Sequence, residues 1–338
     1  MKKLFLFVLG TSLLGCSAQQ KSTEKADPEK YAETITSEEL SKHLYIFASD
    51  EFEGRDTGEP GQKKAAEYLK TEYKKLGIVS PMGGDDYFQE VPGSYFTRGT
   101  IKDTENVLAY IEGTEKPDEI LVISSHYDHV GVDSEGNVFN GADDDGSGTV
   151  AILEIAEAFA KAKKDGNGPK RSILFLNVTG EEKGLVGSRF YTENPVFPLK
   201  QTIANLNIDM IGRIGKGMED AGDYVYLIGS DKLSTELHNI SEAANKKYTN
   251  LNLDYTFNDE NDPNRFYYRS DHYNFAKHDI PIIFYFNGVH ADYHKVTDTP
   301  DKIEYDLLEK RAKLIFYTAW ELANRAERPF VDKPTLTE

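Results

Sequence analysis

The sequence is poor in three features that define whole classes of protein: cysteine, clusters of positive charge and long apolar runs. Cys16 is the only cysteine among 338 residues, which excludes intramolecular disulfides. Acidic residues outnumber basic ones by 57 to 39, the formal net charge is −18, and no run of Lys or Arg provides a local exception. Such a surface repels nucleic acid and anionic lipid, so we expect no nucleic-acid partner.

The first 15 residues have the pattern of a signal peptide. A short basic start precedes the apolar run from Leu4 to Leu9, which is too short to span a bilayer. Leu13-Leu14-Gly15-Cys16 resembles the lipobox of bacterial lipoproteins, with Leu14 in place of the usual small residue. An ordinary signal peptide with an incidental cysteine is the alternative. The resemblance implies lipidation at Cys16, a flexible tether over residues 16–30, and an exported, membrane-anchored protein of the cell envelope.

Strands and helices alternate from residue 106 onward, which predicts an α/β fold. This pattern favours a three-layer α/β/α domain, over about residues 31–330, with a mixed, mostly parallel central sheet. A turn that contains Gly and Pro joins the first two strands, so we expect these two to form a hairpin. Strands are predicted over residues 106–111, 120–125, 173–178, 203–209, 224–228 and 280–286, and helices over residues 150–160 and 304–326.

Residues 31–105 precede this metal-binding α/β core (residues 106–326) and have helical patterns. Thr36 and Glu39 have the spacing of a capping box, and a helical apolar stripe follows at Leu40, Leu44 and Phe47. A second helix is predicted over residues 62–76. We therefore expect this stretch to pack on the core as a helical layer of the same domain.

Side chains that can bind metal follow four of the predicted strands. Because the sites of open α/β sheets lie outside the carboxyl ends of the strands, we expect these side chains to converge at one edge. They are His126 and Asp128, Glu181 and Glu182, Asp209, and His294.

Three consecutive aspartates, Asp143 to Asp145, add to this group at the start of a predicted helix. Alone they would be a solvated acidic cap, but near other ligands a divalent cation neutralises them far better than a helix N-terminus does. Histidine and carboxylate ligands without thiolates suit zinc, with Mn²⁺ or Co²⁺ as possible substitutes. Two histidines and three carboxylates are too many for one tetrahedral ion, and they suit two ions that share a carboxylate.

These motifs occur in the order seen in the M28 family of zinc peptidases, which includes aminopeptidases, glutamate carboxypeptidases and glutaminyl cyclases. The chain resembles this family over about residues 37–326. Each motif is weak alone, and the ordered set is specific. The motifs are His126-x-Asp128, Gly141-Ala142-Asp143-Asp144-Asp145-Gly146-Ser147-Gly148, Glu181-Glu182, Asn207-Ile208-Asp209-Met210-Ile211-Gly212 and Tyr293-His294.

The resemblance implies two zinc ions per chain and a defined set of ligands. Asp144 would bridge the two ions and would be joined to Asp145 by a cis peptide bond. Glu182 and His294 would complete one site, and His126 and Asp209 would complete the other.

The resemblance also implies roles for three residues around the metals. Glu181 would be the general base, which takes a proton from the metal-bridging water and passes it to the leaving amine. Asp128 would orient His126, and Tyr293 would stabilise the oxyanion.

Two other histidines compete for places in the site. His129 follows His126 closely, but alternation at a strand end predicts that it points away, to the surface or behind the ligands. His290 is an alternative to His294, which is preferred because it lies in the motif that resembles the family's last one.

The activity that the resemblance favours is hydrolysis of N-terminal residues from peptides. A glutaminyl cyclase-like transferase and a carboxypeptidase on the same scaffold are the alternatives. Residues 77–106 are too few for the protease-associated insert that carboxypeptidase members often carry, and the position of the basic side chains Arg213, Arg265 and Arg269 is open. A binding lipoprotein without catalysis is a further alternative, but such relatives lose metal ligands, and this chain retains all five.

Overall fold

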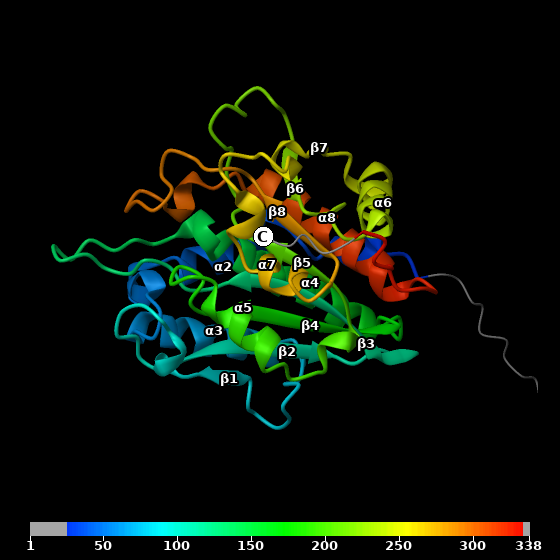
Figure 1. Ribbon diagram of the computed structural model, residues 1–338, viewed down its shortest axis with the longest axis horizontal. Helices are drawn as coiled ribbons and strands as arrows, with labels where there is room; N and C mark the ends of the chain where they lie inside the picture. The colour runs from blue at the N-terminus through cyan, green and yellow to red at the C-terminus, as the bar shows by residue number, and fades with distance from the viewer. Residues whose placement is uncertain (1–25, 334–338) are drawn as a thin grey trace, which may run out of the picture.

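An eight-stranded sheet with helices on both faces forms the centre of the computed structural model, which describes residues 26–333 (Figure 1). The strands run in the order β1-β2-β4-β3-β5-β8-β6-β7. Strands β4, β3, β5 and β8 are parallel to their neighbours at the centre, whereas β1, β2 and β6 add antiparallel pairs. The mixed, mostly parallel sheet predicted from the sequence is thus confirmed. The strands are β1 (Phe88–Val91), β2 (Thr104–Ile111), β3 (Lys116–His126), β4 (Arg171–Val178), β5 (Thr202–Ile208), β6 (Tyr224–Ile228), β7 (Asn252–Asp254) and β8 (Ile282–Phe286).

The predicted hairpin between the first two strands of the core is wrong. Strand β2 pairs with β1 and β4, and β3 lies between β4 and β5. Strand β4 therefore lies between β2 and β3. The turn that connects β2 and β3 contacts the residue just before β4, since the amide of Thr114 donates to the carbonyl of Pro169. The residues of β3 from Ile120 onward are buried, as expected of a central strand that is covered on both faces. Such an apolar run does not reveal which strands are its neighbours.

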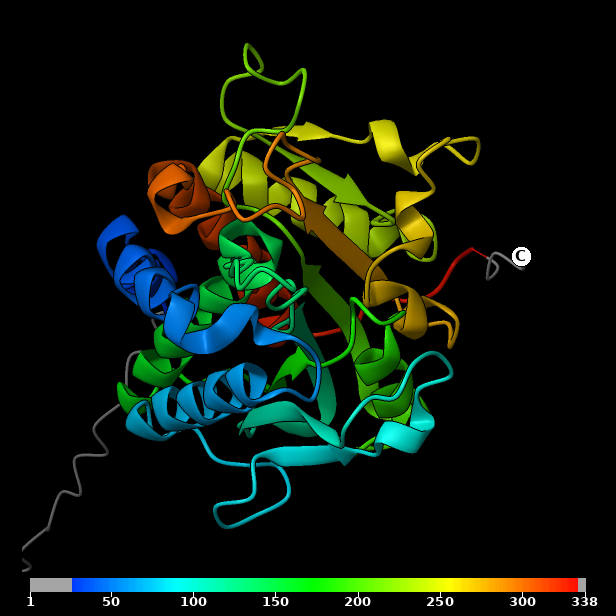
Figure 2. The same ribbon diagram turned by 90° about the vertical axis from the view of Figure 1, so that its left-hand side faces the viewer.

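The helices form two layers (Figure 2). Helices α4 and α8 pack on β3 and β4, and α2 and α6 pack against α8 on the same side. Helix α5 contacts β2, and α7 contacts β5 and β8, on the opposite face. The three-layer α/β/α arrangement therefore agrees with the sequence. The helices are α1 (Glu29–Ala32), α2 (Ser37–Phe47), α3 (Pro60–Lys75), α4 (Gly148–Lys164), α5 (Val186–Glu193), α6 (Thr235–Ala244), α7 (His272–Ala276) and α8 (Tyr305–Asn324).

The N-terminal layer follows the predicted pattern with one exception. The side chain of Thr36 accepts a hydrogen bond from the amide of Glu39 at 3.2 Å, and Leu40, Leu44 and Phe47 are buried. However, β1 lies in this stretch and joins the sheet, so residues 31–105 are not purely helical. The four residues of β1 are too few for a clear alternation of apolar and polar side chains, because only Val91 is fully buried.

Neither terminal segment belongs to the described structure. The predicted signal peptide, Cys16 and most of the predicted tether lie outside residues 26–333. Within that range, no helix has both the length and the apolar character needed to cross a membrane.

The helical layer encloses a carboxyl group without a cation beside it. Oε1 of Glu154, on α4, lies 3.4 Å from Nε2 of His43 on α2, and Oε2 has no hydrogen-bond partner. Burial raises the pKa of Glu154 to about 8 and lowers the pKa of His43. The folded protein therefore keeps a proton on Glu154 that the unfolded chain releases above its ordinary pKa of 4.5. The free energy of unfolding falls as the pH rises between these two values.

The variant Glu154→Gln copies the protonated form and is expected to remove this pH dependence. Its stability should match the wild type near pH 4.5, the ordinary pKa, and exceed it by up to about 5 kcal/mol at pH 9. Urea unfolding of both proteins at the two pH values, with chelator present so that metal content is equal, measures the difference. A difference that does not change with pH would contradict the interpretation.

Candidate metal centre

The carboxyl ends of three parallel strands bring the predicted ligands to one edge of the sheet. His126 is the last residue of β3 and lies opposite Val178, the last residue of β4. Glu181 and Glu182 follow β4 after a two-residue turn, and Asp209 follows directly on β5. The fourth element, the loop after β8, brings His294 to the same place. The convergence predicted from strand ends is therefore what the structure has.

The three consecutive aspartates have different contacts. Oδ1 of Asp143 accepts hydrogen bonds from the amide of Gly212 at 2.7 Å and from the hydroxyl of Ser147 at 2.9 Å. Oδ1 of Asp145 accepts from the amides of Gly148 and Met210, both at 3.0 Å. The carboxylate of Asp144 instead faces histidine side chains, and the peptide bond from Asp144 to Asp145 is cis, as the resemblance implied. The middle aspartate is thus the one that is available to a metal.

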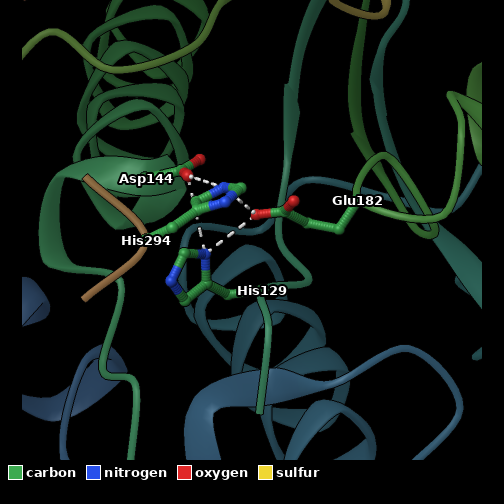
Figure 3. A group of neighbouring side chains, drawn as sticks. All are labelled: His129, Asp144, Glu182 and His294. Carbon is green, nitrogen blue, oxygen red and sulfur yellow. Dashed lines mark ion pairs between the residues drawn. The ribbon is translucent and has the colours of Figure 1, made fainter. Parts of the chain in front are cut away.

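One group of potential ligands is built around Glu182 (Figure 3). Nε2 of His294 lies 2.9 Å from Oδ2 of Asp144 and 3.0 Å from Oε1 of Glu182. Nδ1 of His129 lies 3.1 Å from the same oxygen of Glu182 and 3.7 Å from Oδ2 of Asp144. The four side chains point toward a common centre.

A second group shares Asp144 with the first. Nε2 of His126 lies 3.2 Å from Oδ1 of Asp144 and 3.5 Å from Oδ1 of Asp209. The two oxygens of Asp144 therefore face different groups, Oδ1 toward His126 and Oδ2 toward His294. This is the arrangement that a carboxylate bridging two cations requires.

Several of the converging atoms are buried and have no hydrogen-bond partner. Buried polar atoms are usually paired, and a set of unpaired ones that converge is explained by a cation between them. The donor set of histidine nitrogens and carboxylate oxygens is the one that zinc accepts. The residues present therefore fit zinc. The atoms are Nδ1 of His129, Oδ2 of Asp144, Oε1 of Glu182 and Nε2 of His294.

The two competing histidines have different outcomes. A surface position for His129 is wrong, since its ring is fully buried and faces Glu182. The chain turns after β3, so alternation along the strand does not extend to this residue. The ring packs closely on the loop that carries the three aspartates (residues 141–147, the metal loop). A Cβ added at Gly141 would lie 2.5 Å from the His129 ring. His290 points instead at Asp143, with Nε2 at 3.1 Å from its Oδ2, and stands outside both groups, which agrees with the preference for His294.

Asp128 holds the loop of the candidate base as well as lying near His126. Nδ1 of His126 is 3.1 Å from the backbone carbonyl of Asp128 and 3.8 Å from its carboxylate. That carboxylate accepts hydrogen bonds from the amide of Glu181 at 3.2 Å and from the hydroxyl of Thr57 at 2.7 Å. In this structure Asp128 therefore contacts His126 through its main chain and Glu181 through its side chain.

Glu181 lines the pocket beside the two ligand groups and is not a member of either. Burial, reinforced by the negative charges of Glu182 and Asp209, raises the pKa of Glu181 well above its usual range. A carboxylate whose environment favours the protonated form is suited to accept a proton.

A pocket opens beside the two groups and reaches into the apolar side of the sheet. It is small, with a cavity volume of about 40 Å³, and Asp144, Glu181 and Asp209 contribute to its wall. Tyr293 lines the same pocket, and its ring stacks on His294 with centroids 3.9 Å apart. Burial raises the pKa of Tyr293 above its usual range, so the phenol keeps its proton and can donate it in a hydrogen bond.

Two residues that the sequence analysis did not assign hold the metal loop in place. The buried guanidinium of Arg55 donates to the carbonyls of Asn140 and Gly141, at 2.6 and 2.8 Å. The carboxylate of Asp298 accepts from the amides of Asp143 and Asp144, at 3.0 and 3.2 Å. No spacing pattern connects either residue with the aspartates, because the contacts are long-range.

The mixed sheet and its edge of converging ligands place the molecule among α/β proteins with a candidate metal centre at the carboxyl ends of their strands. The fold resembles the LapA aminopeptidase from Legionella pneumophila, with a TM-score of 0.69 and 22% identity over 96% of this chain and 81% of that chain. It also resembles BSAP, a zinc aminopeptidase from Bacillus subtilis, with a TM-score of 0.66 and 17% identity over 89% and 99% of the two chains. At these identities the likeness establishes the fold.

The family follows from the sequence itself. Residues 106–319 match the model of peptidase family M28. A protein of Arthroderma otae, described as a probable leucine aminopeptidase, is 31% identical over 297 residues, which cover 78% of each chain. The chain therefore belongs to peptidase family M28.

Other curated relatives share a shorter region. A protein of Arabidopsis thaliana, described as a probable glutamate carboxypeptidase, is 34% identical over 139 residues. These residues are 39% of this chain and 19% of the relative, so the chain matches less than a fifth of that relative's length.

Proposed function

We propose that this protein is a zinc-dependent exopeptidase that removes the N-terminal residue from peptides. The observation that carries the proposal is the position of Asp144, whose two carboxylate oxygens face two different ligand groups beside Glu181. Membership of peptidase family M28 and the aminopeptidase names among its relatives support the same reaction.

Two zinc ions per chain fit the ligand groups. His126 and Asp209 would hold one ion, Glu182 and His294 would hold the other, and Asp144 would contact both. His129 is either a further ligand of the second ion or a hydrogen-bond donor to Glu182, since its Nδ1 is 3.1 Å from that carboxylate. Bound zinc would supply Lewis acidity, which polarises the scissile carbonyl and lowers the pKa of water.

Three side chains of the protein perform the remaining tasks. Glu181 takes a proton from the attacking water and delivers it to the nitrogen of the leaving amine. The same carboxylate thus accepts and returns the proton that peptide hydrolysis transfers. Asp128 fixes the loop of Glu181 through the amide of that residue and thereby orients the base. Tyr293, which lines the same pocket, donates a hydrogen bond from its phenol to the oxygen of the scissile carbonyl as negative charge develops there.

Specificity for the N-terminal residue follows from the pocket beside the metal centre. Asp144, Glu181 and Asp209 line a pocket of limited size with otherwise largely apolar walls. A free α-amine can form a hydrogen bond with Glu181, which is not a zinc ligand, whereas an acyl group on that nitrogen needs space that a small pocket does not offer. The pocket therefore favours a single residue with a free amino group.

A panel of substrates tests this proposal. Purified, zinc-loaded protein should hydrolyse leucine p-nitroanilide, should leave N-acetyl-leucine p-nitroanilide intact, and should release ammonia from N-terminal glutamine peptides no faster than buffer does. Cleavage of N-blocked peptides from the C-terminus would replace the proposal with a carboxypeptidase. Cyclisation of glutamine would replace it with a glutaminyl cyclase, and binding without turnover would replace it with a non-catalytic lipoprotein.

We also propose that the protein is exported and anchored in the cell envelope through a lipid on Cys16. The support is the basic and apolar start of the chain and the lipobox-like Leu13-Leu14-Gly15-Cys16. Labelled palmitate should be incorporated into the wild type in the native bacterium and should be absent from Cys16→Ala. Label that persists in the variant would rule out this anchor.

A further inference from the structure

Two depressions meet at the candidate base. The apolar side chains of the pocket described above are Met210, Phe266, Phe284, Phe286 and Val289. A second depression shares Glu181, Arg269 and Tyr293 with the pocket and adds the charged side chains of Arg98, Lys183 and Glu182, beside Leu185 and Tyr268. The scissile bond must lie where the two meet, because the base borders both.

Arg269 is the cationic side chain common to both depressions. It is exposed, and its guanidinium lies 4.8 Å from the ring centroid of Phe266. Within residues 26–333 it forms no ion pair, and its hydrogen bond to the carbonyl of Asn264 is long, at 3.5 Å. Arg98 has no ion pair within this range either, whereas Lys183 pairs with Asp56 at 2.6 Å.

Position distinguishes Arg269 from the other two arginines that the sequence left open. Arg213 pairs with Asp292 at 3.0 Å. Arg265 stacks on Tyr268 and lines a separate depression that does not contain Glu181. A cation that borders the candidate base and has no ion pair within the described residues points to a ligand with a negative charge at that place.

We propose that Arg269 binds a carboxylate on the residue that follows the scissile bond, so that the preferred substrates are dipeptides with an apolar N-terminal residue. This inference rests on the proposed aminopeptidase function. The α-amino group lies beside Glu181, and the apolar side chain fills the inner part of the pocket. The free α-carboxylate of the second residue then meets the guanidinium. A peptide with both charged ends close together is thus oriented by both of them.

The same carboxylate chemistry has two sources: the free C-terminus of a dipeptide, or an acidic side chain directly after the bond. Four substrates separate them: Leu-Ala, its amide Leu-Ala-NH₂, and the amide pair Leu-Glu-NH₂ and Leu-Gln-NH₂. Leu-Ala differs from its amide only in the terminal charge, and the second pair differs only in the side-chain charge. Release of free leucine gives kcat/KM for each.

The zinc-loaded wild type should cleave Leu-Ala about tenfold more efficiently than Leu-Ala-NH₂, as expected for a charge-assisted contact at an exposed site. The preference should appear mainly in KM, should shrink as salt is added, and should disappear in Arg269→Gln. Arg265→Gln is the matched control, because this arginine lies four residues earlier and also stacks on an aromatic ring. It should retain the full preference.

Equal kcat/KM for Leu-Ala and Leu-Ala-NH₂ together with equal values for the Glu and Gln amides would overturn the inference, as would a preference that survives Arg269→Gln. A preference confined to Leu-Glu-NH₂ would assign the carboxylate to the side chain and would overturn the dipeptide preference. Leucine p-nitroanilide separates the two proposals: if it is cleaved while the inference fails, the aminopeptidase function stands, and if no substrate is cleaved, that function itself is wrong.

Discussion

Glu181→Gln is expected to lower kcat by about 10²- to 10⁴-fold while leaving the zinc content unchanged, because it removes a proton acceptor that is not a member of either ligand group. Glutamine keeps the size of the side chain and cannot take a proton from water. Glu181 stands outside both ligand groups, and its amide hydrogen bond to Asp128 does not depend on the side chain. KM should therefore change little.

The adjacent glutamate provides the matched comparison. Oε1 of Glu182 lies 3.0 Å from Nε2 of His294, so Glu182→Gln should lose zinc together with activity. Zinc content by elemental analysis and turnover of leucine p-nitroanilide, measured on both variants, separate the two roles. Activity of Glu181→Gln within a few-fold of the wild type, or loss of its zinc, would remove Glu181 from the mechanism.

Strand ends made the convergence of the candidate ligands predictable from the sequence. A buried parallel strand of α/β type leaves its carboxyl end at a common edge, so residues such as His126 and Asp209 meet regardless of their separation along the chain. The alternation of strands and helices predicted the layers for the same reason, since each strand needs a helical crossover to return in parallel. Both inferences depend only on local sequence patterns: the apolar runs of the strands and their alternation with helices.

The errors concern arrangements that local patterns do not determine. The neighbours of β2 and β3 depend on which strand is inserted between them, and a run buried on both faces is compatible with several orders. The direction of His129 depends on the turn after β3. Arg55 reaches the carbonyl of Gly141 across 86 positions of sequence, and no periodicity carries that information.

Asp144→Asn is expected to reduce the zinc content from two ions to less than one and to abolish measurable turnover. The carboxylate presents Oδ1 to His126 and Oδ2 to His294, whereas an amide has one weaker oxygen ligand and a nitrogen that cannot bind zinc. In the proposed two-zinc centre, both ions would lose their shared anion, and the repulsion between them would no longer be offset.

The two neighbouring aspartates are internal controls for this experiment. Asp143 and Asp145 use Oδ1 to accept backbone amide protons, and the amide oxygen of asparagine can accept the same bonds. Asp143→Asn and Asp145→Asn should therefore keep most of their zinc even where their stability falls. Elemental analysis of the three variants after dialysis, with circular dichroism to show that each is folded, gives the comparison. A two-ion centre requires that Asp144, whose carboxylate faces both ligand groups, matters more for zinc binding than its two neighbours. Equal zinc loss in all three folded variants would therefore show that this turn has only a structural role.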